Sequence, residues 1–130
     1  MTSILLIEDD HLFRETLANA LTERGFAVTQ AADGEAGVKL FRVAPTDLVI
    51  TDIVMPNKEG IALVVELHRD FPKLGIIAMS GGAARDPALY LKLAGLFGAN
   101  RTLPKPFTID ALLGAIQGML AETGKGKPAS

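Results

Sequence analysis

The sequence predicts an α/β domain in which a doubly wound, five-stranded parallel sheet carries helices on both faces. Two observations lead to this class. Five short apolar runs alternate along the chain with five segments of helical periodicity. Several of these runs are apolar at every position, which is typical of strands covered on both faces. Alternating strands and helices are joined by crossovers that leave the strands parallel.

Three of the apolar runs predict the buried strands of the sheet, and two predict its edges. Residues 4–7, 48–50 and 76–79 are apolar almost throughout. Residues 26–30 are more mixed in character, and residues 101–103 form only a short run. We therefore expect the second and fifth strands to lie at the edges of the sheet.

Each segment between the strands has apolar residues at helical spacing, which predicts one buried face per helix. The expected buried residues, in chain order, are Phe13, Leu17, Ala20 and Leu21; Val38 and Phe41; Ile61, Val64, Val65 and His68; Leu89, Leu93, Leu96 and Phe97; and Ile109, Leu112, Leu113, Ile116 and Leu120.

Capping and breaking residues mark the ends of these helices. Asp10 and Thr108 are the expected N-caps of the first and fifth helices, and Asp33 precedes the second. Gly25 and Gly98 follow the apolar stripes of the first and fourth helices and are expected to end them. Pro45 and Pro72 close the second and third helices, since proline cannot continue a helix.

Length and composition predict one domain over residues 1–122 and a flexible tail over residues 123–130. The 13 basic and 15 acidic residues give a net charge of −2, which argues against nucleic acid as a partner. The absence of cysteine excludes disulfides and thiolate metal sites. We see no apolar run long enough to cross a membrane and no signal peptide, so we expect a cytoplasmic protein.

Polar residues follow four of the predicted strands, at the edge where open α/β sheets bind their ligands. Glu8 and Asp9 follow the first strand, Asp52 the third, Ser80 the fourth and Lys105 the fifth. Clustered carboxylates repel one another unless a cation such as Mg²⁺ lies between them. A carboxylate can also be a phosphoryl nucleophile, and a nearby lysine can neutralise the transferred group. The sequence therefore predicts a cleft suited to Mg²⁺ and phosphoryl chemistry.

Four segments together resemble the response-regulator receiver domains of two-component signalling. These are residues 4–10, 47–56, 79–81 and 103–107. The resemblance extends from residue 3 to about residue 121, nearly the whole chain. It implies a flavodoxin-like receiver fold with strand order 2-1-3-4-5 and five helices.

The resemblance also implies a role for each matching residue. Asp52 is similar to the phospho-acceptor, while Lys105 and Ser80 resemble the lysine and hydroxyl that contact the phosphoryl group. Asp9 resembles a direct Mg²⁺ ligand and Glu8 its acidic partner, and Asp52 is also expected among the ligands. The backbone carbonyl of Val54 takes the place of a further ligand. A cis peptide bond between Lys105 and Pro106 is also expected from the family.

The implied function is that of a phospho-accepting response regulator. Its partners would be a histidine kinase or phosphotransfer protein and an unknown downstream protein, reached by protein–protein contact. Its only reactions would be transfer to Asp52 and loss of the phosphoryl group from it. A receiver cut from a longer regulator is also consistent with the sequence.

Three alternatives come from other classes of function. A flavin carrier is disfavoured because residues 8–10 would repel a phosphate and the chain has few aromatic rings. An aspartyl phosphohydrolase would need a second acid where Val54 stands. A degenerate receiver that acts as a phosphorylation-independent interaction module remains open.

The sequence departs from the family pattern in ways that bear on switching. Thr102 stands where receivers usually carry an aromatic residue that moves on activation. Val54 and Gly82 stand where side chains commonly influence the lifetime of the phosphoryl group, and neither can orient a water. We therefore expect phosphorylation to act through Ser80 on residues 81–86, and through them on the helix that contains Tyr90.

Overall fold

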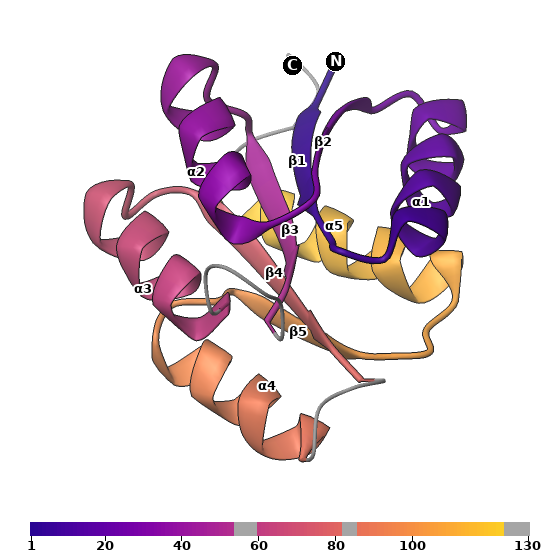
Figure 1. Cartoon of the computed structure of the whole chain (residues 1–130). Coiled ribbons are helices and arrows are strands. Elements are labelled where there is room, and N and C mark those ends of the chain that lie inside the picture. Colours follow the sequence, from indigo (N-terminus) through magenta and orange to yellow (C-terminus); the bar gives the residue numbers. More distant parts are fainter. Residues whose placement is uncertain (54–59, 82–85, 124–130) are drawn as a thin grey trace.

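The computed structural model describes residues 1–53, 60–81 and 86–123 and has the predicted fold. Five parallel strands form one sheet in the order β2-β1-β3-β4-β5, as expected (Figure 1). The elements are β1 (Ser3–Ile7), α1 (His11–Glu23), β2 (Ala27–Ala31), α2 (Gly34–Val43), β3 (Leu48–Asp52), α3 (Gly60–Asp70), β4 (Gly75–Ser80), α4 (Pro87–Leu96), β5 (Arg101–Pro104) and α5 (Ile109–Thr123).

Helices cover both faces of the sheet, which explains why the central strands are apolar at successive positions. Helices α2, α3 and α4 pack on one face, and α1 and α5 pack on the other (Figure 1). Along β1, Leu5 and Ile7 pack into the core between the sheet and α2, α3 and α4, while Ile4 and Leu6 pack into the core between the sheet and α1 and α5. Strands β2 and β5 are largely exposed and lie at the edges, as predicted.

The predicted capping residues begin and end the helices. Asp10 accepts a hydrogen bond from the Phe13 amide at 3.1 Å, and Thr108 accepts one from the Ala111 amide at 3.0 Å. Gly25 and Gly98 have φ angles of +92° and +129°, which other residues rarely adopt. Both glycines follow a helix end, where such angles reverse the chain.

The buried faces of two helices differ from the prediction. In α4, Leu89, Leu96 and Phe97 are 50%, 72% and 47% exposed, whereas Ala94 is buried and Tyr90 packs against the core. The spacing rule was wrong here because α4 is apolar on almost every side, so the pattern fits more than one face.

Helix α3 shows the same error in a milder form. Val64 is buried as predicted, but Leu63 and Leu67 bury their side chains in place of Val65 and His68. Consecutive apolar residues again allow two faces. Among the described helices, none combines the length and the apolar character that a membrane span requires.

Candidate functional site

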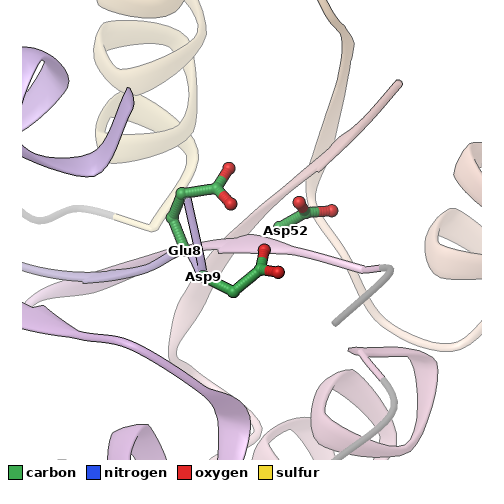
Figure 2. A group of neighbouring side chains, drawn as sticks. All are labelled: Glu8, Asp9 and Asp52. Carbon is green, nitrogen blue, oxygen red and sulfur yellow. The ribbon is translucent and has the colours of Figure 1, made fainter. Parts of the chain in front are cut away.

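Three acidic side chains meet at the carboxyl edge of the sheet. Glu8 and Asp9 follow β1, and Asp52 is the last residue of β3. One carboxylate oxygen from each lies within 4.8 Å of the other two. Figure 2 shows these carboxyl groups around one region, two from the segment after β1 and one from the neighbouring strand. The parallel pairing of β1 with β3 is what places these strand ends together.

The three acids differ in their exposure to solvent. Glu8 is 1% exposed and Asp52 is 7% exposed, whereas the side chain of Asp9 is open to water. The Glu8 backbone is held on both sides, because its amide donates to the Ala31 carbonyl and its carbonyl accepts from Arg14 at 2.8 Å. The Glu8 carboxylate also accepts from the amide of Asp10 at 3.1 Å.

Lys105 joins two of these acids. Its ammonium donates to Glu8 Oε1 and, at 3.0 Å, to Asp52 Oδ2. The amide of Lys105 donates to the Ser80 carbonyl at 2.7 Å, and the peptide bond from Lys105 to Pro106 is cis, as predicted. A Cβ added at Gly81 would lie 2.6 Å from the Lys105 Cβ, so only glycine fits beside this lysine.

Burial and charge change the protonation of this pair. Burial raises the pKa of Glu8 to about 7, because the hydrogen bonds from Lys105 and the Asp10 amide only partly offset desolvation and the nearby Asp9 and Asp52 oppose a further charge. Burial alone would lower the pKa of Lys105, but its contacts with Glu8 and Asp52 outweigh it and raise that pKa. Lys105 therefore stays cationic at neutral pH, where Glu8 can exchange a proton.

Ser80 places an unused hydroxyl at the same edge. It is the last residue of β4 and is fully buried. Over the part of the chain that the structure describes, its Oγ is the buried side-chain polar atom without a hydrogen-bond partner. Buried polar groups are almost always paired, so this hydroxyl is an unusual feature and can donate a hydrogen bond at the carboxyl edge of the sheet.

Comparisons with known proteins agree with this geometry. The family model for the response regulator receiver domain matches residues 4–117. The chain belongs to the response-regulator receiver family.

Individual relatives show how widely this similarity extends. A probable chemotaxis protein CheY from Rhizobium etli is 38% identical over 117 residues, which cover 88% of each chain. The response regulator MprA of Mycolicibacterium vanbaalenii is 33% identical over 92% of this receiver and 51% of its own length. The receiver thus spans nearly all of the first relative and about half of the second.

Solved structures share the fold. A response regulator receiver domain from Clostridium thermocellum has a TM-score of 0.85 and 28% identity, covering 95% of this receiver and 98% of its own chain. The response regulator TrrA of Thermotoga maritima, solved in complex with Mg²⁺ and BeF, has a TM-score of 0.79 and 28% identity over 92% of this receiver and its own full chain.

The structure brings together the predicted site residues that it describes. Glu8, Asp9, Asp52 and Lys105 form one cluster, and Ser80 lies at the next strand end. The Val54 carbonyl and Gly82 lie outside the described residues. The acidic pocket of this receiver has the hard oxygen donors that Mg²⁺ prefers, so its composition fits that ion.

Sequence reasoning missed the contact between Phe13 and Lys105. Phe13 was predicted only as part of the buried face of α1, yet its ring centroid lies 4.6 Å from Lys105 Nζ. The sequence carries no signal for this contact, because the two residues belong to distant segments that only the tertiary fold brings together.

Proposed function

We propose that this receiver accepts one phosphoryl group on Asp52 from the phosphohistidine of a histidine kinase or phosphotransfer protein. The observation that carries the proposal is the Lys105 ammonium bound to Asp52 within a cluster of three carboxylates. This arrangement places a nucleophilic carboxylate beside a positive charge at the carboxyl edge of the sheet. Its state would then reach a downstream protein by direct contact in the cytoplasm.

The chemical step follows from these groups. A carboxylate oxygen of Asp52 attacks the phosphorus, an O–P bond forms and the P–N bond of the phosphohistidine breaks. The bonding electron pair leaves with the imidazole nitrogen, which takes up a proton. Phosphoryl transfer depends mainly on positioning and charge neutralisation, and Lys105 is placed for both. The reaction is confined to Asp52 of the receiver itself.

Glu8, Asp9 and Asp52 are the residues that would hold Mg²⁺. The ion would neutralise negative charge on the phosphoryl oxygens during transfer. The proposal is supported by the separation of these carboxylates and by the Mg²⁺–BeF complex of the related TrrA. The Val54 carbonyl remains a proposed further ligand.

Ser80 and Lys105 would receive the transferred group. The buried Ser80 hydroxyl lacks a partner among the described residues and can donate to a phosphoryl oxygen. The ammonium of Lys105 can pair with a second phosphoryl oxygen. Because a charge-assisted hydrogen bond is stronger than a neutral one, phosphorylation would draw Ser80 toward Asp52.

Phosphorylation can be tested directly. The purified receiver is mixed with acetyl phosphate and Mg²⁺, and its intact mass is followed over time. We expect the addition of one labile phosphoryl group, which Asp52→Asn and chelation of Mg²⁺ both abolish. Asp110→Asn is the matched control, because Asp110 is an exposed carboxylate in the first turn of α5.

Two results would contradict the proposal. Labelling of Asp52→Asn at the wild-type rate would move the acceptor elsewhere. No labelling of the wild type by acetyl phosphate or by any histidine kinase of the source organism would favour the alternative function, a phosphorylation-independent interaction module.

A further inference from the structure

A pair of aromatic rings lies beside Lys105, and the proposed chemistry gives these rings no role. The Lys105 ammonium lies over the ring of Phe13, 4.6 Å from its centroid. Phe107 meets Phe13 edge to face, with centroids 6.0 Å apart and an angle of 86° between the rings. Phe13 comes from α1 and Phe107 follows the cis bond after Lys105, so the pair connects two separate segments at the site.

The face of an aromatic ring attracts a cation, and this attraction grows when the cation is removed from water. The Lys105 side chain is only 18% exposed, so its attraction to the Phe13 ring is stronger than that of a fully exposed lysine. Within the described part of the chain, the ammonium thus contacts the carboxylates of Glu8 and Asp52 and the ring of Phe13.

A lysine side chain has four rotatable bonds and loses much freedom when it is held in one place. The two carboxylates and the Phe13 ring all contact the charged end of that chain. The Phe13 ring supplies a surface at the ammonium, and Phe107 packs edge to face against that ring. Edge-to-face packing of this kind stabilises aromatic pairs beyond simple burial.

We propose that Phe13 is a positioning residue, which holds the Lys105 ammonium at Asp52 and thereby raises the rate of phosphoryl acceptance. Phe107 supports it by fixing the Phe13 ring. The effect on rate rests on the proposed function, whereas the hold on Lys105 does not.

The competing explanation is that Phe13 only fills space. It packs against the core between α1, α5 and the sheet, where Phe26 occupies a comparable, half-buried position. Phe13→Leu keeps an apolar side chain but removes the ring, whereas Phe13→Tyr keeps the ring. Phe26→Leu is the matched control, because it makes the same change in the same core, away from Lys105.

The first measurement needs no phosphorylation. In NMR spectra of the receiver, the Lys105 methylene protons next to Nζ should be shifted upfield by the Phe13 ring. We expect this shift to vanish in Phe13→Leu and to persist in Phe13→Tyr and Phe26→Leu. Unchanged Lys105 resonances in a folded Phe13→Leu would overturn the proposal, whether or not the receiver accepts a phosphoryl group.

The second measurement is the rate of labelling by acetyl phosphate at saturating Mg²⁺. We expect Phe13→Leu to lower this rate by at least about five-fold and by up to about thirty-fold, the factor that corresponds to the full loss of a desolvated cation–π contact. Phe13→Tyr should restore most of the rate, and Phe26→Leu should leave it unchanged. Equal losses in Phe13→Leu and Phe13→Tyr would show that packing alone matters and would also overturn the proposal.

Phe107→Leu provides a second variant in case Phe13→Leu does not fold. It leaves the Phe13 ring in place but removes its edge contact, so the upfield shift of Lys105 and the labelling rate should both decrease by a smaller amount. If a folded Phe107→Leu kept the wild-type Lys105 shift and the wild-type labelling rate, Phe107 would have no part in positioning Lys105. A wild type that is not labelled at all would contradict the proposed function, while the resonance test would still decide the contact.

Discussion

Replacing Ser80 by alanine should have opposite effects on the resting receiver and on the receiver that carries a phosphoryl analogue. The Ser80 hydroxyl is fully buried and has no partner among the described residues. An unsatisfied buried polar group costs about 1–3 kcal/mol. Ser80→Ala removes this penalty and leaves a small void, so the free energy of unfolding in Mg²⁺ alone should stay constant or rise by about 1 kcal/mol.

The loaded receiver should lose stability through the same substitution. If Ser80 donates to the phosphoryl group, that charged hydrogen bond contributes about 1.5–3 kcal/mol. Beryllium fluoride with Mg²⁺ can serve as the phosphoryl analogue. The stabilisation that it gives the wild type should therefore decrease by about 1.5–3 kcal/mol in Ser80→Ala.

Urea unfolding with Mg²⁺ alone and with Mg²⁺ plus beryllium fluoride measures both effects. Ser3→Ala is the matched control, because the Ser3 hydroxyl accepts from the Asp47 amide at 2.9 Å and donates to its carboxylate. This control should lose about 1 kcal/mol in both conditions. The role assigned to Ser80 would be refuted by two results together. In Mg²⁺ alone, Ser80→Ala would lose as much unfolding free energy as Ser3→Ala, and beryllium fluoride would stabilise Ser80→Ala as much as it stabilises the wild type.

The remaining predictions concern the metal and the fit around the lysine. Mg²⁺ should bind about ten-fold more tightly at pH 8 than at pH 6 by calorimetry, because a proton on Glu8, whose pKa is about 7, competes with the ion below that pH. Asp9→Ala should weaken Mg²⁺ binding more than ten-fold, over about 1.4 kcal/mol, whereas Lys105→Ala should leave it unchanged or tighten it. Equal weakening of Mg²⁺ binding in Asp9→Ala and Lys105→Ala would contradict the proposed placement of the ion among the carboxylates. Gly81→Ala should slow labelling of Asp52 by acetyl phosphate, because its Cβ displaces Lys105; a wild-type rate would show that Lys105 tolerates the shift.

The sheet and the acidic cluster could be predicted because each depends on local sequence and on one rule of topology. Residues 4–7 and 48–50 are apolar at every position, so their burial on both faces of the sheet could be predicted from the sequence. Parallel strands place their carboxyl ends along one edge, and Asp52 therefore had to lie near Glu8.

The buried faces of α3 and α4 could not be read in this way. Periodicity identifies a buried face only when the opposite face is polar. In α4, Tyr90 and Ala94 face the core, while Leu89 and Leu96 are apolar but exposed. Which of two apolar faces turns inward depends on the neighbouring elements, so the sequence of one helix does not contain the answer. The expected changes in residues 81–86 remain a prediction, because residues 82–85 lie outside the described part of the chain.

The charges of the site explain why Lys105 would have different partners in its two states. Three carboxylates meet at the site, and Lys105 is the counterion of two of them, Glu8 and Asp52. A divalent cation among the carboxylates would take over that neutralisation, which would leave the ammonium available for an incoming phosphoryl group. The lysine must then stay near Asp52 without the full attraction of Glu8. A ring face serves this purpose, because Phe13 attracts the ammonium yet carries no charge that would repel the phosphoryl group.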